Sequence, residues 1–448
     1  MVKDKNFAEK KSLVSSNWIS ITFDIFVWLL KSDAMKKMLP IISAFVLLML
    51  CSCSSDDDRG TALFAVPIVK SLSEIRSEIT ISAARQTNSD GKIYVAEHYL
   101  FYIAKEHGIH IFNNENPAAP VNMAFINLEG VHDIAVKGHY LYADNFVDLV
   151  VFDISDINNI SLVRTVPNSV EFSPVFPTEA TYYDVSVAVE SDQIITGYRL
   201  EMKDIPDEQY QTVYEDAMAE AASGGVNGVG AGGSYAKFQI NDDALYTVDN
   251  FSLNVFNITN PELAAFDKKI YMQQWFGGGI FETLFKRKDF LFIGSTSGMF
   301  VVDASDEFNP VFISGFSHAT ACDPVVVNEN LAYITVRGGT TCGAIEDQVN
   351  VIDISDINNP SLISTTLLHQ PYGLGIKGQT LFVCCGNEGL KVFDATDSNA
   401  LSLQNTYPGN LTDVIPMDSH LIAVGPNKIV QYAYGDGNTL DVISTVNF

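Results

Sequence analysis

Short runs of apolar residues, rich in β-branched and aromatic side chains, alternate with clusters of turn residues along most of this chain. Each run has the length of a strand, and Asp, Asn, Ser, Gly or Pro separates it from the next. This pattern is typical of β-strands joined by tight turns. The exception is an insertion over residues 207–234, where a helix-like run from Gln209 to Ala222 leads into a glycine-rich segment. The sequence therefore predicts an all-β fold with one projecting loop.

One motif recurs along the chain. Its clearest copies are LVVFDISDINNISLVRTV at 149–166 and VNVIDISDINNPSLISTT at 349–366, and a strand ending in LY or LF precedes each copy. Aligning the position that follows the VF pair of each copy gives eight residues: Asn113, Asp153, Asp204, Asn257, Asp303, Asp353, Asp394 and Ala433.

The spacing of these positions, 39 to 53 residues, fixes the kind of repeat. Each unit holds about four strand-like runs, which is the period of a β-propeller blade. We expect about eight four-stranded blades, or seven if the third unit, residues 181–205, is only a strand pair. We also expect a strand around Glu78–Ala83 to close the ring against the last blade.

Several of these segments resemble a known family. GKIYV at 91–95, VDLVVFDIS at 147–155 and GLKVFDATD at 389–397 are similar to the LVIVD-repeat β-propeller lipoproteins of Bacteroidetes. The resemblance covers about residues 75–448. It implies the propeller fold and no particular activity.

Residues 35–53 look like an export signal. Lys36 and Lys37 precede an apolar run from Leu39 to Leu50 that is short for a membrane span, and small residues lead into Cys53. This arrangement resembles the bacterial lipoprotein signal, in which that cysteine receives the lipid. We expect Cys53 to be the lipid attachment site and residues 1–34, upstream of Met35, to be a mis-assigned start; a simple membrane anchor is the alternative.

Residues 54–74 are expected to form an acidic, flexible leader that opens with Ser54-Ser55-Asp56-Asp57-Asp58. An acidic run directly after the lipidated cysteine resembles the signal that sends Bacteroidetes lipoproteins to the cell surface. The expected location is therefore the outer membrane, with the protein lipid-anchored and surface-exposed.

The charge balance excludes one class of partner. The chain has 27 Lys+Arg against 54 Asp+Glu, a net charge of −27, and such an acidic surface repels nucleic acid. Apolar residues make up 47% of the chain, which is enough to bury a large core.

The first strand of each blade lines the central channel of a propeller, so its leading residues are candidates for a site. These residues are Lys92, Asp133, Asp184, Lys237, Glu282, Asp323, Gly373 and Asp413, and His132 lies beside Asp133. Five carboxylates around one axis repel each other unless they hold water, a cation or a cationic ligand. Ca²⁺ is the candidate cofactor, because it binds six to eight oxygens; the alternative is that each acid caps a local turn.

The remaining acids and the cysteines have simpler interpretations. Asp153, Asp303 and Asp353 recur at strand ends, where they are expected to accept backbone N–H bonds. Cys322 and Cys342 flank two strands joined by a turn, and we expect them to form a disulfide. In the pair Cys384-Cys385 one side chain is expected to be buried and the other exposed.

Catalytic motifs such as G-x-S-x-G, the Walker sequence and HExxH do not occur in the sequence. The sequence thus favours a non-catalytic module that binds or scaffolds a protein or glycan through its loop face. The alternative is a hydrolase or lyase that uses the acids of the channel mouth, Asp133, Asp184, Glu282 and Asp323, with or without Ca²⁺.

Overall fold

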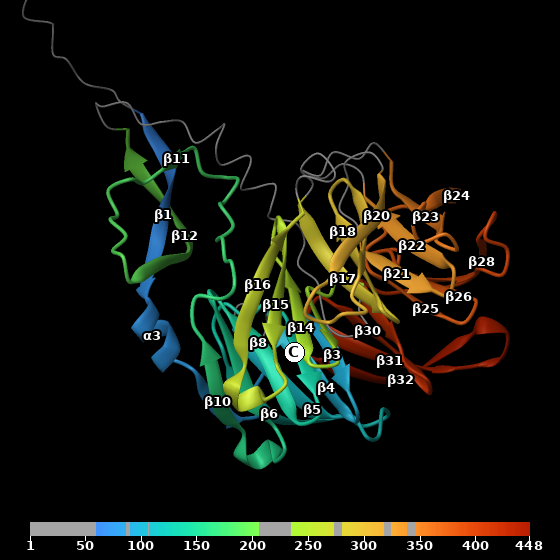
Figure 1. Ribbon diagram of the computed structural model, residues 1–448, viewed down its shortest axis with the longest axis horizontal. Helices are drawn as coiled ribbons and strands as arrows, with labels where there is room; N and C mark the ends of the chain where they lie inside the picture. Colours follow the sequence, from blue (N-terminus) through green and yellow to red (C-terminus); the bar gives the residue numbers. More distant parts are fainter. Residues whose placement is uncertain are drawn as a thin grey trace, which may run out of the picture. The chain divides into compact units, whose positions relative to one another are not determined.

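The computed structural model describes residues 60–86, 90–105, 107–205, 234–272, 280–317, 324–337 and 346–448. Seven antiparallel sheets of four or five strands follow one another along this part of the chain (Figure 1). The motif predicted from the repeats forms the third strand of each sheet and the turn after it.

The first three blades run to residue 271. Blade 1 consists of β3 (Gly91–Ala96), β4 (Tyr99–Ala104), β5 (Gly108–Asn113), β6 (Val121–Asn127) and an outer strand, β2 (Thr80–Ala83). Blade 2 consists of β7 (Ile134–Lys137), β8 (Tyr140–Asn145), β9 (Asp148–Asp153) and β10 (Ser161–Val166). Blade 3 consists of β13 (Phe238–Asn241), β14 (Ala244–Val248), β15 (Ser252–Asn257) and β16 (Ala265–Tyr271).

Four further blades follow. Blade 4 has β17 (Phe281–Arg287), β18 (Phe290–Ser295), β19 (Gly298–Asp303) and β20 (Val311–Ser317). Blade 5 has β21 (Val325–Asn328), β22 (Leu331–Val336), β23 (Gln348–Asp353) and β24 (Ser361–Leu367). Blade 6 has β25 (Leu374–Lys377), β26 (Thr380–Cys384), β27 (Leu390–Asp394) and β28 (Ser402–Tyr407). Blade 7 has β29 (Asp413–Pro416), β30 (His420–Gly425), β31 (Lys428–Tyr434) and β32 (Leu440–Asn447).

Within the described residues, short 3₁₀ turns occur in three of the blades. They are η1 (Ile157–Asn159), η2 (Pro261–Leu263) and η4 (Asp436–Asn438). In the first two, the side chain of the preceding residue, Asp156 or Asn260, accepts a hydrogen bond from the backbone within the turn. Such caps satisfy N–H groups that the turn leaves unpaired.

The third repeat unit is not a blade, so the count of eight is wrong and the alternative of seven is confirmed within the described residues. Its strands, β11 (Tyr182–Tyr183) and β12 (Gln193–Asp204), flank β1 (Thr61–Ser71) in a separate three-stranded sheet. β11 runs parallel to β1, with Phe64 opposite Tyr182. Helix α3 (Leu72–Ser77) follows β1, and its N-terminus is capped by Ser71, whose Oγ accepts a bond from Glu74 N at 3.1 Å. The expectation of a flexible leader over residues 54–74 is therefore wrong from Thr61 onward, where the chain forms β1 and enters α3.

First strands of successive blades lie side by side, from β3 through β7, β13, β17, β21 and β25 to β29, and β3 also contacts β30. The ring is therefore closed by the packing of blade 1 against blade 7. The expected closure by Glu78–Ala83 is wrong, because β2 pairs with β6 of blade 1. All four strands of blade 7 come from residues 413–447.

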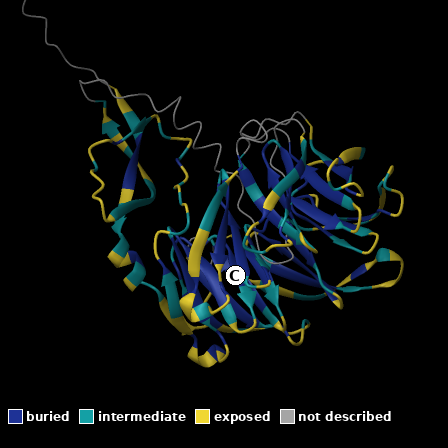
Figure 2. Ribbon diagram, viewed as in Figure 1, coloured by how far each residue is buried: buried dark blue, intermediate teal, exposed yellow. Residues whose placement is uncertain are grey.

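The hydrophobic cores lie between blades. One cluster joins Ile93 and Tyr102 of blade 1 to Ile415 and Ile422 of blade 7. Because neighbouring blades cover both faces, the second and third strands of the blades are buried along most of their length, which Figure 2 shows in dark blue. A buried inner strand therefore reads as a continuous apolar run in the sequence.

The inner-strand packing also corrects the expectation for the cysteine pair. Both Cys384 and Cys385 are buried, in two different clusters, and both are free thiols. Alternate side chains of β26 face blades on opposite sides, so neither is exposed to solvent. Burial raises the pKa of Cys385 to about 12.

Several predicted features lie outside the described residues. They are residues 1–34, the signal at 35–53 with Cys53, the acidic start of the leader, Asp323, the pair Cys322 and Cys342, and the insertion 207–234 except for Ser234. Within the described residues, no helix has the length and apolar character needed to span a membrane.

Candidate functional site

The leading residues of the first strands meet at one mouth of the ring. Asp133 Oδ2 accepts hydrogen bonds from the backbone N–H groups of Lys237 (2.6 Å) and Phe238 (3.1 Å), so the start of β7 is fastened to the start of β13. Its other oxygen accepts from Ile134 N at 2.8 Å. Burial raises the pKa of Asp133 to about 7, although Lys92 and these N–H groups act in the opposite direction. Asp133 is a clamp between two blades.

Asp413 makes a second link at this mouth. Its Oδ1 accepts from Ser234 Oγ at 3.1 Å, and Ser234 Oγ in turn accepts from Leu374 N at 2.9 Å. These bonds connect the starts of β13, β25 and β29. Burial raises the pKa of Asp413 to about 7, and its Oδ2 has no hydrogen-bond partner within the described residues.

Asp184 does not join this group, because it follows β11 in the three-stranded sheet. There its carboxylate accepts bonds from Lys203 Nζ at 2.5 Å and from Ser186 Oγ at 2.6 Å. Burial opposes ionisation of Asp184, but the bonds from Lys203 and Ser186 prevail and lower its pKa to about 2. Glu282 lies on β17, and Asp323 is outside the described residues.

Of the predicted ring acids, Asp133 and Asp413 lie at the mouth and accept hydrogen bonds there, whereas Asp184 lies beside another sheet. Within the described residues, no group of three or more His, Cys, Asp or Glu side chains is placed to hold a metal ion. Asp184 accepts bonds from Ser186 two residues later, as a local cap would, whereas Asp133 links two blades.

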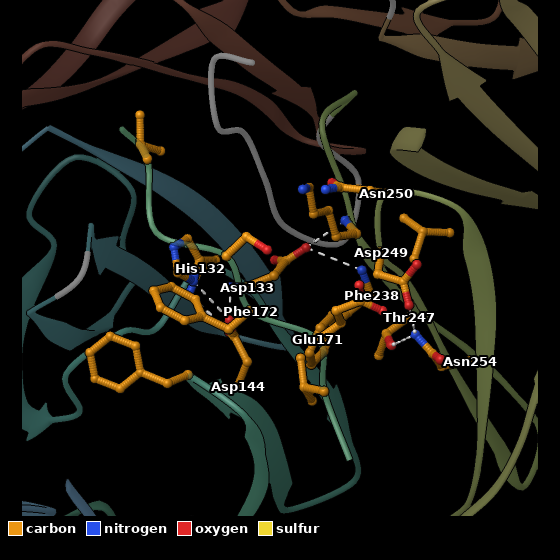
Figure 3. A pocket seen from close by; sticks show the side chains of 16 residues that line it. His132, Asp133, Asp144, Glu171, Phe172, Phe238, Thr247, Asp249, Asn250 and Asn254 are labelled. Atoms are coloured by element: carbon orange, nitrogen blue, oxygen red, sulfur yellow. Dashed lines mark hydrogen bonds and ion pairs between the residues drawn. The ribbon is translucent and has the colours of Figure 1, made fainter. Parts of the chain in front are cut away.

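A pocket of about 100 Å³ opens beside Asp133, between blades 2 and 3 (Figure 3). Its lining combines rings, carboxylates and amides, and includes His132, Asp144, Glu171, Phe172, Asp249 and Asn254. Of these residues, the sequence pattern singled out His132. The others lie at strand ends and in the loop after β10, where the repeat gives no sign of their convergence.

His132 and Asp144 form a pair on one wall of the pocket. His132 Nδ1 lies 3.0 Å from Asp144 Oδ2, and Asp144 Oδ1 accepts from the backbone N–H groups of His132 (2.9 Å) and Asp133 (2.8 Å). Burial opposes ionisation of Asp144, but these hydrogen bonds hold its pKa below the usual value. The arrangement fixes the orientation of the imidazole, as in catalytic His–carboxylate pairs.

The opposite wall is organised by Asp249. Its carboxylate accepts from Ser252 Oγ at 2.5 Å and from Asn254 Nδ2 at 3.0 Å, and it lies 3.1 Å from Lys269 Nζ. Lys269 also binds Glu171 at 2.8 Å. The Asn254 amide oxygen is buried and has no partner within the described residues, so an acceptor is free there.

The turn acids behave as the sequence predicted. Asp153, Asp303 and Asp353 each accept a bond at 2.8 Å from the backbone N–H two residues later. Asn113 and Asn257 make the same contact in their blades, at 2.9 and 3.0 Å. These residues close the turn after the third strand, and their role is structural.

Comparison with known proteins gives one family match. A family model described as the LVIVD repeat matches residues 130–167, which cover blade 2 and the segment leading into it. No curated protein sequence matches the chain.

Solved structures support the fold. A putative 6-phosphogluconolactonase from Bacteroides fragilis is 11% identical with a TM-score of 0.50, covering 88% of this chain and 97% of that one. The periplasmic gluconolactonase of Pseudomonas aeruginosa is 10% identical with a TM-score of 0.50, covering 82% of this chain and 96% of that one. At such identities the likeness concerns architecture alone. The chain is thus an all-β protein that carries an LVIVD repeat and, within its described residues, folds into about seven β-propeller blades.

Proposed function

We propose that this protein is a lipid-anchored, non-catalytic binding module at the outer face of the outer membrane, and that the pocket between blades 2 and 3 receives the end of a glycan. The observation that carries the proposal is the state of the pocket's polar groups. Asp133, Asp144 and Asp249 are occupied by fixed protein partners, whereas the Asn254 amide oxygen is free on one wall and the ring of Phe172 lies near His132 on the other. A pocket that offers a free acceptor and an aromatic ring suits a hydroxyl-bearing ring.

The size of the pocket limits what enters it. A volume of about 100 Å³ is well below the roughly 300–1,000 Å³ of pockets that enclose a whole small-molecule ligand. A terminal sugar edge fits this space, and the rest of a longer glycan would lie on the loop surface outside. A protein ligand is the alternative that the test below distinguishes.

The test is binding of a glycan library to the immobilised full chain, followed by calorimetry with the best ligand. Asn254→Ala and Phe172→Ala should each weaken binding about tenfold, while Phe266→Ala, an exposed phenylalanine on β16, should leave it unchanged. If no glycan binds and a surface protein is captured instead, with the same dependence on Phe172, the ligand is a protein. If all three variants bind the glycan equally, the pocket between blades 2 and 3 is not the binding site.

Anchoring is tested separately. Cys53→Ser should abolish incorporation of labelled palmitate and release the protein from the membrane fraction. A variant that is still labelled and retained would rule out lipid attachment at Cys53. Protease treatment of intact cells then reports whether the anchored protein faces outward.

A second candidate function rests on the His132–Asp144 pair. An imidazole held by a carboxylate can act as a general base on water, and the two similar structures named above are called a putative 6-phosphogluconolactonase and a gluconolactonase. A hydrolase of this kind would act on a lactone or ester. The acid-based version with Asp133 and Asp184 is less favourable, because these two residues lie in different sheets and are both hydrogen-bonded.

Hydrolysis of gluconolactone above the spontaneous rate, measured in a pH-stat, tests this candidate. His132→Gln should remove the enzymatic rate, and His139→Gln, a histidine in the turn between β7 and β8, should not. If the wild-type protein hydrolyses gluconolactone no faster than the spontaneous reaction, binding remains the single candidate function.

A further inference from the structure

Three buried side chains at the ring mouth have hydrogen-bond donors without an acceptor among the described residues. They are Lys92 Nζ, the Nε and Nη2 groups of Arg337, and the Tyr235 hydroxyl; each residue is only 6% exposed. None of these atoms has a hydrogen-bond partner within the described residues. Removing a cation from water without giving it a partner is unfavourable, so such a group points to a missing ligand.

The three residues come from different blades and approach the same mouth. Lys92 is the second residue of β3 in blade 1, Arg337 directly follows β22 in blade 5, and Tyr235 precedes β13 in blade 3. Tyr235 is adjacent in sequence to Ser234, which is bonded to Asp413 at the start of blade 7. The charges of Arg337, Asp413 and Glu282 act on the pKa of Tyr235, and the charge of Asp413 acts on the pKa of Lys92.

The free edge of Arg337 identifies the kind of ligand. Nε and Nη2 are the two parallel donors with which a guanidinium binds two oxygens of a carboxylate or phosphate. Elsewhere in this protein, Arg76 uses the same pair of atoms on Asp148, at 2.6 and 2.9 Å. The ring of Tyr372 lies 4.6 Å from Arg337 Cζ and covers one face of the guanidinium, which holds the group in place and leaves its edge open.

We propose that Arg337, Lys92 and Tyr235 form a site for a small anion, carboxylate or phosphate, at the mouth of the central channel. Arg337 binds two oxygens of the anion through its free edge, and Lys92 and Tyr235 donate to the remaining oxygens. This site is distinct from the pocket between blades 2 and 3, so either can exist without the other.

The nearby acids are compatible with an anion. Asp133 is occupied by three backbone N–H groups. Asp413 has one free oxygen, and burial raises its pKa to about 7, so a protonated Asp413 can donate a bond to the ligand. A ligand that also carries hydroxyl groups can donate to this oxygen when Asp413 is ionised.

Calorimetric titration of the full chain with sodium phosphate and with sodium gluconate, at constant ionic strength set with chloride, tests the site. We expect one probe to bind saturably at one site per chain, and the better probe identifies the class of anion. Arg337→Lys keeps the charge and loses the two-donor edge, so it should weaken binding at least tenfold. Arg199→Lys, an exposed arginine on β12, is the matched control and should bind like the wild type.

A milder variant keeps the test valid if Arg337→Lys fails to fold. Tyr235→Phe removes one hydroxyl and should weaken binding three- to tenfold, with circular dichroism confirming the native fold. Lys92→Met should abolish the increase in melting temperature that the anion gives the wild type. The proposal is overturned if neither probe binds the wild type, or if Arg337→Lys, Tyr235→Phe and the control all bind it equally.

Discussion

Aspartate side chains stabilise this protein at two kinds of position. At Asp153 and its counterparts the carboxylate closes a turn within one blade, through one bond to the backbone N–H two residues later. At Asp133 it accepts three backbone N–H groups, two of them from the next blade. The first role is local and readable from the repeat, whereas the second depends on how neighbouring blades are placed.

This difference predicts unequal costs for removing the two side chains. Asp133→Ala leaves three N–H groups without their acceptor, and we expect it to lower the free energy of unfolding by about 2–4 kcal/mol. Asp153→Ala removes one exposed bond and should cost about 1 kcal/mol or less. Urea denaturation of both variants measures the difference, and equal losses would contradict the clamp role of Asp133.

Asp413 predicts a dependence on pH. Its pKa in the folded protein is raised to about 7, above the unfolded value near 4, so the folded state binds the proton more tightly. The contribution of Asp413 to stability therefore falls as the pH rises from about 4 to 7, and the cost is complete above 7. Asp413→Asn, which cannot ionise, should gain stability relative to the wild type between pH 5 and pH 8, on the order of 1 kcal/mol.

Melting temperatures of both proteins at pH 5 and pH 8 check this sign. The control is Asp418→Asn, an exposed carboxylate in the turn between β29 and β30, which should show no such change. If the melting temperatures of Asp413→Asn and the wild type differ by the same amount at both pH values, Asp413 does not titrate in this range.

The sequence could predict some site residues and not others. The turn acids and the leading residue Asp133 follow from the repeat, because each occupies a fixed place in a blade. Ser234 ends a glycine-rich segment and Arg337 precedes two glycines, which in sequence are signs of exposed loops. Both are buried because several blades meet around one axis, and that convergence joins residues more than a hundred positions apart.

At the scale of elements, strands were easier to predict than their partners. The third unit lacks a turn between its middle strands, and the structure has there one strand of 12 residues, β12. Its pairing with β1 joins segments about 130 residues apart, which no local pattern reveals. A unit with the right spacing can thus leave the ring when its strands find another partner.

Glycines at the start of third strands predict a second kind of sensitivity. Gly108 and Gly298 open β5 and β19 with φ of +148° and +144°, and a Cβ at either would collide with a backbone carbonyl of the fourth strand. Gly298→Ala should therefore lower the free energy of unfolding by about 2 kcal/mol or more. Gly197→Ala has open space and ordinary φ, and should be neutral. Chemical denaturation measures both, and a neutral Gly298→Ala would contradict the predicted clash.

At the scale of the whole ring, closure depends on side chains. Phe448 stacks on Tyr102 of blade 1 with ring centroids 3.9 Å apart, and Asn114 and Gln431 exchange two hydrogen bonds of 3.0 and 2.7 Å between blades 1 and 7. Ser444 Oγ also donates to Pro117 O at 2.6 Å. These contacts take the place of a strand shared between the first and last blades.

Phe448→Ala should therefore weaken the whole ring. We expect a loss of about 2 kcal/mol, since the change removes a ring packed against the core at the junction. Val442→Ala, an exposed residue on β32, is the control and should change the melting temperature little. If Phe448→Ala melts at the same temperature as the wild type, Phe448 does not help to hold the junction, and the other contacts between blades 1 and 7 suffice.

Closure without a shared strand bears on how the length of such a protein can change during evolution. Each of blades 2 to 7 is built from one contiguous stretch of chain, such as residues 281–317 for blade 4. A duplication or deletion of one such stretch adds or removes a complete blade, and no strand has to be recruited from the other terminus to repair the seam. The number of blades can therefore vary by simple recombination. The first and last blades of the new ring then need only side chains that match where they meet.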